Sequence, residues 1–179
     1  PPVSLCGTLS VRRGRACGEF LGVSYCTKCF SLCAHTHTTA NRGYAVMQVN
    51  FRGSTGYGRK HFKAGNKEWG RNMQNDVTDA VNWTIDQGIA DKDRVCIYGA
   101  SYGGYAVMAG ITFTPDMYKC AVNYVGVTDL ELLWETMPPQ WEIFEEQQTV
   151  DIGDPEKDKE LLTARSPLNF VDKIKTPLY

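Results

Sequence analysis

Three short apolar runs mark the chain beyond residue 40. They cover Tyr44–Asn50, Arg94–Tyr98 and Cys120–Val125, and each is bounded by glycine on at least one side. Apolar runs of this length, without strict alternation of polar residues, are typical of strands buried on both faces of a parallel sheet. We therefore expect the three runs to form neighbouring parallel strands of one sheet.

A helical period separates these runs. Between Asn72 and Gln87, apolar positions recur every three or four residues, and Gly88 follows as a stop signal. A second helix is expected over Ser101–Ile111, directly after the middle strand. Because strands alternate with helices, the pattern predicts an α/β fold, a three-layer sandwich with a parallel sheet on which both helices pack.

Three shorter helices and a further strand are expected toward the C-terminus. The helices lie near Asp129–Thr136, Gln140–Gln148 and Asp154–Ala164, and an Asp–Pro pair opens the last of them. Lys175–Tyr179 has the composition of a strand that is beginning. Since the chain also starts at Pro1 without an initiator methionine, we expect a fold truncated at both ends, as in a piece of a longer chain.

Residues 1–39 differ from the rest, because they are rich in Cys, Ser, Thr, Gly and Arg and show no period. We expect them to form a cysteine-rich irregular segment outside the core, with one compact domain over residues 40–179. Two cysteines with two residues between them could share a zinc ion with a nearby cysteine or histidines. All these candidates lie between residues 26 and 37, without the separated second pair of structural zinc sites. We therefore expect no metal at these residues: Cys26, Cys29, Cys33, His35 and His37.

Composition and charge exclude several classes of partner. Of the 179 residues, 42% are hydrophobic and 22% are charged, which is ordinary for a globular domain. The net charge of −1 gives no basis for binding nucleic acid or an anionic membrane. No apolar run reaches the roughly 18 residues that would span a bilayer, and no signal peptide is visible. We therefore expect no nucleic acid, no membrane and a cytoplasmic location.

Residues 99–103 form a G-x-S-x-G motif between a predicted strand and a predicted helix. In this context the motif marks a nucleophile elbow, a sharp turn that holds the serine hydroxyl above the sheet edge. Gly99, Gly103 and Gly104 are then required because the turn leaves no room for side chains. The alternative is a glycine-rich turn whose serine only caps the helix. We identify Ser101 as the candidate nucleophile and the backbone N–H of Tyr102 as a candidate oxyanion-hole donor.

Several further blocks surround this motif in order, namely Asn50–Gly58, Glu68–Gly70, Asp76–Val81, Ala90–Val95 and Gly99–Tyr105. Together they resemble the catalytic domain of the prolyl oligopeptidase family, above all its acylaminoacyl-peptidase and dipeptidyl-peptidase-like members. The resemblance covers about residues 40–179. It implies an α/β-hydrolase fold, a Ser–Asp–His triad and an oligopeptide substrate. It also implies a β-propeller domain in the full-length protein.

The chain departs from that pattern in its histidines. In α/β hydrolases the acid and the histidine follow the serine, whereas His35, His37 and His61 all precede Ser101. The His-Gly-Gly-Pro segment that resembling enzymes use for part of the oxyanion hole is absent before Asn41. A serine hydroxyl is a poor nucleophile without an adjacent imidazole. We therefore expect this chain alone to be nearly inactive and His61 to be a solvated surface residue.

Three functions remain open from the sequence. The chain can be part of a serine peptidase, part of an α/β hydrolase that cleaves esters, or an inactive fragment without a catalytic role. No cofactor is expected, because the glycine-rich loop Phe51–Gly58 lacks the Gly-Lys-Ser/Thr ending of a phosphate-binding loop.

Overall fold

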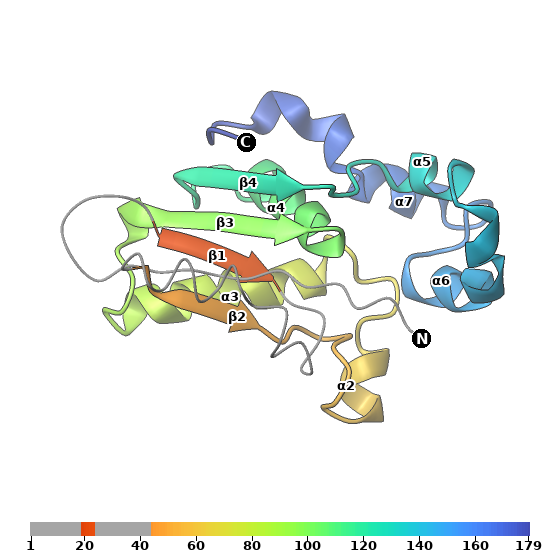
Figure 1. The fold of residues 1–179 in the computed structure, drawn as a ribbon, viewed down its shortest axis with the longest axis horizontal. Coiled ribbons are helices and arrows are strands. Elements are labelled where there is room, and N and C mark those ends of the chain that lie inside the picture. The colour runs from red at the N-terminus through yellow and green to blue at the C-terminus, as the bar shows by residue number, and fades with distance from the viewer. Residues whose placement is uncertain (1–18, 24–43) are drawn as a thin grey trace.

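The computed structural model describes residues 19–23 and 44–179 (Figure 1). In chain order the elements are β1 (Glu19–Val23), β2 (Val46–Val49), α2 (Arg59–Lys63), α3 (Asn72–Asp86), η2 (Lys92–Arg94), β3 (Val95–Ala100), α4 (Tyr102–Phe113), β4 (Cys120–Tyr124), α5 (Leu130–Glu135), η3 (Pro139–Phe144), α6 (Glu145–Asp151), α7 (Lys159–Arg165) and η4 (Pro167–Lys173). From β2 to β4, helices separate the successive strands.

A parallel sheet organises these elements. Its strand order is β2-β1-β3-β4, and every neighbouring pair is parallel. Next to β4, Leu178 forms a parallel bridge with Ala121, and the Asn123 N–H donates to the Tyr179 carbonyl at 2.8 Å. The three predicted strands therefore share one sheet, and the segment expected to begin a further strand forms an isolated parallel bridge to β4.

Strand β1 corrects two expectations. It lies between β2 and β3, with Phe20 in register with Val46 on one side and Cys96 on the other. The runs at residues 44–50 and 94–98 are therefore not neighbours. The expectation that residues 1–39 lie outside the core is also wrong for Glu19–Val23, and the remainder of that segment lies outside the described residues.

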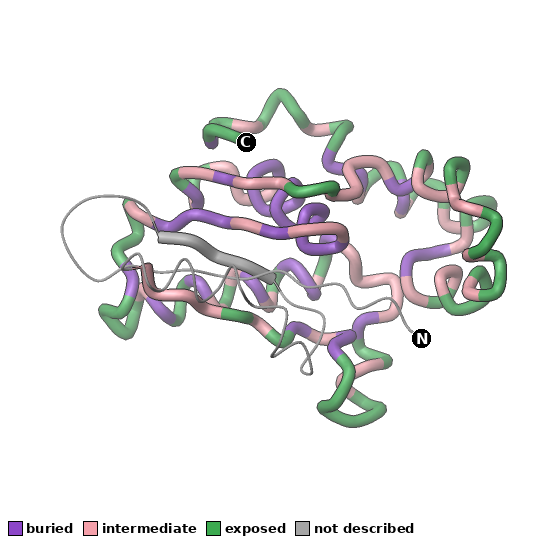
Figure 2. Tube along the Cα trace, viewed as in Figure 1, coloured by how far each residue is buried: buried purple, intermediate pink, exposed green. Residues whose placement is uncertain are grey.

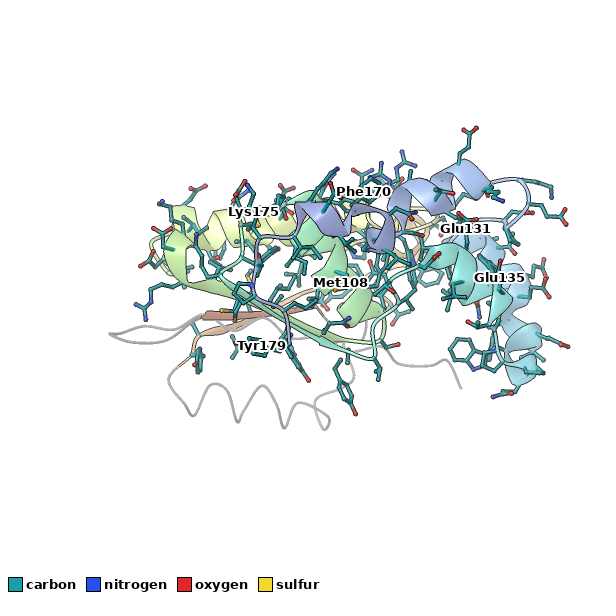
Figure 3. All side chains as sticks on the ribbon, turned by 90° about the horizontal axis from the view of Figure 1, so that it is seen from above. Met108, Glu131, Glu135, Phe170, Lys175 and Tyr179 are labelled. Carbon is teal, nitrogen blue, oxygen red and sulfur yellow. The ribbon has the colours of Figure 1, made fainter. Side chains whose placement is uncertain are left out.

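Helices α3 and α4 lie on the same face of the sheet, and η4 packs against α4 (Figure 3). All residues of α4 from Tyr102 to Thr112 are buried, as Figure 2 shows along its length. A helix that is apolar all round must be enclosed, and α4 contacts β1, β3, β4, α3 and η4. This helix therefore fixes the end of β3 within the core, and the end of β3 carries the G-x-S-x-G motif.

The shorter helices follow the sequence less closely. The helix expected over Asp129–Thr136 is present as α5, but the single helix expected over Gln140–Gln148 is divided into η3 and α6. Helix α7 begins at Lys159 rather than at Asp154. The Asp154 carboxylate instead accepts the N–H groups of Glu156 and Lys157, which closes a turn before the helix. Among residues 19–23 and 44–179, no helix combines the length and apolar content needed to cross a membrane.

Candidate active site

Ser101 occupies the turn between β3 and α4. Its backbone has φ 56° and ψ −117°, a conformation that residues with a β-carbon rarely adopt. Its N–H donates to the Tyr124 carbonyl at 3.0 Å, and its carbonyl accepts the Tyr105 N–H at 3.1 Å. The Ser101 hydroxyl forms no capping hydrogen bond with the first turn of α4. Helix capping therefore does not explain why a serine stands in this turn.

The glycines of the motif allow two backbone segments to touch. A β-carbon on Gly99 would overlap the carbonyl group of Gly103, so β3 and the first turn of α4 are in direct contact. A β-carbon on Gly104 would overlap the Cα of Gly126 and lie 2.9 Å from its nitrogen. The crowding expected at Gly99 is present. The backbone of Gly103 is what a β-carbon on Gly99 would contact.

An aromatic cluster supports the turn from inside the core. The Tyr102 side chain is 2% exposed, and its ring centroid lies 5.3 Å from that of Phe51 and 4.4 Å from that of Trp69. The Trp69 ring also contacts Tyr105, whose hydroxyl donates to the Arg165 carbonyl at 2.9 Å. Burial raises the pKa of Tyr105 far above its ordinary value, so this phenol remains neutral. Because Tyr102 directly follows Ser101, packing of its ring restrains the turn.

Tyr102 is also the first residue of α4. The N–H groups of the first helical turn have no intrahelical acceptor and point out of the positive end of the helix. An oxyanion formed beside Ser101 would lie at this end of α4. The position therefore fits the donor role expected for the Tyr102 N–H.

His61 differs from its expectation. It lies on α2, is half-buried, and its Nε2 is 3.0 Å from the Phe51 carbonyl oxygen, which also accepts the Ser54 hydroxyl at 2.6 Å. His61 thus supports the loop after β2 and is not simply a solvated side chain. Among the described residues, none hydrogen-bonds the Ser101 hydroxyl.

The other histidines, His35 and His37, lie outside the described residues, as do the cysteines weighed as zinc ligands. Within the described part of the chain, no group of three or more His, Cys, Asp or Glu side chains is placed to hold a metal ion. The described cysteines, Cys96 and Cys120, are in register on β3 and β4 and are not joined by a disulfide.

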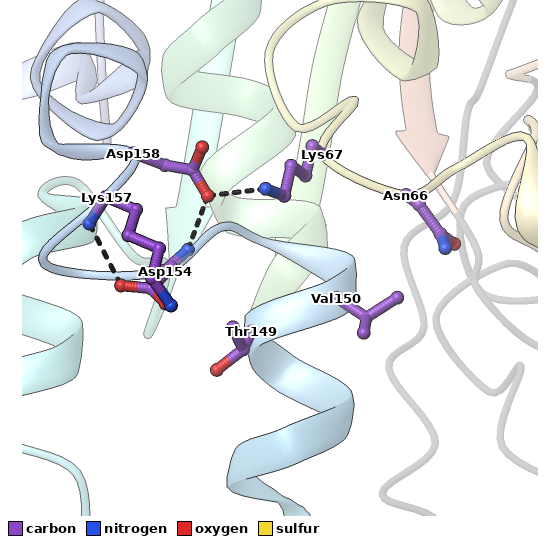
Figure 4. A pocket seen from close by; sticks show the side chains of 7 residues that line it. All are labelled: Asn66, Lys67, Thr149, Val150, Asp154, Lys157 and Asp158. Atoms are coloured by element: carbon purple, nitrogen blue, oxygen red, sulfur yellow. Dashed lines mark hydrogen bonds and ion pairs between the residues drawn. The ribbon is translucent and has the colours of Figure 1, made fainter.

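A cavity of about 400 Å³ lies between the turn before α3 on one side and α6 with the segment that follows it on the other (Figure 4). The ammonium group of Lys67 is 2.6 Å from the Asp158 carboxylate, and that of Lys157 is 3.0 Å from the Asp154 carboxylate. Hydrogen bonds from the backbone N–H and side chain of Lys157, and from the Glu156 N–H, lower the pKa of Asp154 to about 2. The sequence did not reveal this cavity, because the Lys67–Asp158 pair joins residues 91 positions apart. Since these four charges neutralise one another in pairs, we assign the cavity no chemistry.

Comparison with known proteins matches residues 30–179 to the prolyl oligopeptidase family. The chain is 52% identical over 141 residues to dipeptidyl aminopeptidase BIII of Pseudoxanthomonas mexicana, a match covering 78% of this chain and 20% of that protein. It is 44% identical over 142 residues to dipeptidyl peptidase family member 6 of Caenorhabditis elegans, covering 77% of this chain and 19% of that protein. The chain thus spans about a fifth of the length of these relatives.

Solved structures of peptidases also superpose on this chain. A puromycin-hydrolyzing peptidase of Mycobacterium tuberculosis superposes with a TM-score of 0.72 at 32% identity, over 79% of this chain and 21% of that one. An acylaminoacyl peptidase of Pyrococcus horikoshii superposes with a TM-score of 0.67 at 25% identity, over 78% of this chain and 22% of that one. The fold is therefore the α/β-hydrolase fold, as predicted.

Proposed function

The chain belongs to the prolyl oligopeptidase family of serine peptidases, and we propose that it supplies the nucleophile-bearing part of a peptidase that acts on oligopeptides. The observation that carries this proposal is the backbone of Ser101, held at φ 56° between β3 and α4 by glycine contacts and an aromatic cluster. Strained backbone of this kind persists where the surrounding structure over-determines it, and it clusters at active sites. We assign residues 40–179, together with β1, to the catalytic domain.

The proposed reaction begins with attack of the Ser101 hydroxyl oxygen on the scissile carbonyl carbon. A histidine takes the hydroxyl proton, and the Tyr102 N–H is one of the donors that stabilise the oxyanion. The leaving amine then departs with that proton, and water hydrolyses the acyl-enzyme by the same route. We expect the histidine and its acidic partner to follow Tyr179 in a longer protein, because the triad order in this fold is Ser, Asp, His.

The substrate class we propose is an oligopeptide from which a dipeptide is released at the N-terminus. Two relatives that are 52% and 44% identical to this chain are a dipeptidyl aminopeptidase and a dipeptidyl peptidase family member. In the full-length protein, we expect a β-propeller domain to restrict access to oligopeptides. Cleavage of esters alone is the competing function.

The test uses the protein that contains this sequence and extends through the triad acid and histidine. A fluorophosphonate probe should label it at Ser101, and Ser101→Ala should abolish both labelling and release of p-nitroaniline from a dipeptide substrate. Residues 1–179 alone should show neither labelling by the probe nor release of p-nitroaniline. The substrate class is wrong if the extended protein hydrolyses acetylated amino acids or simple esters but not dipeptide anilides. The peptidase proposal itself is wrong if Ser101→Ala retains the activity.

A further inference from the structure

Helix α3 contacts two residues near the Ser101 turn, Arg52 and Tyr102, through side chains that lie one helical turn apart. The Asp76 carboxylate accepts three hydrogen bonds from Arg52, namely from the backbone N–H at 2.9 Å, Nε at 2.8 Å and Nη2 at 2.7 Å. One turn earlier, the Met73 sulfur accepts the Tyr102 hydroxyl at 3.9 Å. A single rigid helix therefore restrains both Arg52 and Tyr102.

Phe51 connects these two points. It directly precedes Arg52, its side chain is 1% exposed, and its ring packs on that of Tyr102. Because Asp76 accepts the backbone N–H of Arg52 as well as the guanidinium, it fixes the main chain next to Phe51 and not only a surface side chain. Helix α3 therefore restrains both partners of the contact between Phe51 and Tyr102. Asp76 fixes the main chain next to Phe51, and Met73 accepts the hydroxyl of Tyr102.

We propose that Asp76 is a positioning residue for the reaction at Ser101, acting through Arg52 and Phe51 on Tyr102. The inference rests on the proposed function, because it concerns the Tyr102 N–H as an oxyanion donor. Tyr102 is bonded directly to the strained Ser101, so a shift of its ring moves the N–H that follows the nucleophile. A displacement of about 1 Å in such a group can lower a rate by roughly 100-fold.

An ordinary structural ion pair makes a different prediction. The Arg52 and Asp76 side chains are 34% and 23% exposed. A partly exposed ion pair of this kind can stabilise the fold without affecting catalysis. Loss of stability alone lowers the amount of folded enzyme but leaves kcat per active site unchanged. Misplacement of an oxyanion donor lowers kcat and leaves KM nearly unchanged, because the oxyanion exists only after attack.

The experiment measures kcat and KM per titrated active site in the extended protein, with a dipeptide anilide as substrate. Asp76→Asn removes the charge, and Arg52→Lys keeps the positive charge but loses the two-pronged geometry. Asp79→Asn is the charge control, because Asp79 lies on the same helix and is exposed, and its carboxylate forms no hydrogen bond or ion pair with a described residue, although its charge acts weakly on Arg52. Val81→Ala is the stability control, since Val81 is a fully buried core residue of α3.

We expect Asp76→Asn and Arg52→Lys to lower kcat by about 10-fold to 100-fold, with KM changed by less than about twofold. Both controls should keep the parent kcat. A dipeptide boronic acid, which imitates the tetrahedral intermediate, should bind Asp76→Asn more weakly by the same factor as the fall in kcat. The effects of Asp76→Asn and Phe51→Leu on kcat should not be additive, because both act on the same contact.

Parent-like kcat in both Asp76→Asn and Arg52→Lys would overturn the inference, and so would an equal fall in Val81→Ala. If Asp76→Asn does not fold, Arg52→Lys decides alone. If Ser101→Ala retains activity, the proposed function fails first and this inference with it. Loss of activity in Ser101→Ala with normal kcat in the Asp76 and Arg52 variants would leave the proposed function intact and reject only the role of Asp76.

Discussion

The backbone of Gly99 lies against the carbonyl group of Gly103, and no β-carbon fits between them. A β-carbon on Gly99 would also be 2.8 Å from the Cα of Gly103, a separation that real β-carbons essentially never show. The contact joins the end of β3 to the first turn of α4, on either side of Ser101. It therefore determines how sharply the chain turns at the candidate nucleophile.

Gly99→Ala should destabilise the domain by about 3 kcal/mol or more, because backbone atoms and not a flexible side chain must move. Urea unfolding measures the loss. Gly88→Ala is the control, since nothing lies within 4 Å of its β-carbon position and only its φ of +67° opposes alanine. That control should lose about 1–2 kcal/mol. A smaller loss for Gly99→Ala than for Gly88→Ala would contradict the crowding.

Ser101→Gly should give a more stable domain than Ser101→Ala, by about 1 kcal/mol, although neither retains a nucleophile. The backbone at position 101 has φ 56°, which glycine adopts without strain and alanine does not. The greater freedom of glycine in the unfolded chain reduces this advantage but does not cancel it. Comparing the urea midpoints of the two variants checks the prediction. Equal stability would mean that the turn stores no strain at Ser101.

The elbow could be predicted from the sequence because its signals are local. Gly99, Ser101 and Gly103 lie within five residues, between an apolar run and a helix-compatible run. The helix over residues 72–86 was found for the same reason, since its period lies within one segment. At these positions the elements predicted from the local sequence agree with those in the structure.

Features that depend on distant partners were missed. Strand β1 is only five residues long and pairs with β2 and β3. The cysteine-rich sequence around it has no hydrophobic period that would predict this strand. His61 was expected to be solvated because its own segment is basic, yet its partner is the Phe51 carbonyl ten residues earlier. The support of Tyr102 by Phe51 likewise joins residues that only the folded chain brings together.

Two buried tyrosines should differ in how their stability responds to removal of the hydroxyl group. The Tyr118 hydroxyl is buried without a hydrogen-bond partner among the described residues, whereas that of Tyr105 donates to the Arg165 carbonyl. Tyr118→Phe should therefore leave stability unchanged or raise it by about 1 kcal/mol, and Tyr105→Phe should lower it by about 1 kcal/mol. Thermal unfolding of the two variants, each compared with the parent, measures both effects. A destabilising Tyr118→Phe would show that its hydroxyl has a partner after all.

The last prediction concerns the pH dependence of the Arg52–Asp76 pair. Partial burial acts to raise the pKa of Asp76, but the hydrogen bonds and charge of Arg52 outweigh it and hold the pKa below its usual value. A carboxyl group whose pKa is lowered on folding stabilises the fold fully above its unfolded pKa of about 3.9. That contribution is lost as pH falls through the lower, folded value.

Asp76→Asn should accordingly lower stability by about 1–2 kcal/mol at pH 7, the range of a partly exposed, charge-assisted pair. The difference from the parent should shrink below about pH 4 and vanish once the Asp76 carboxyl is protonated in the folded state. Urea unfolding of both proteins at pH 7, 5, 4 and 3 follows this difference, with Asp79→Asn as a variant that loses an unpaired carboxylate from the same helix. A difference that stays constant or grows toward acid would mean that Asp76 acts through packing and not through its charge.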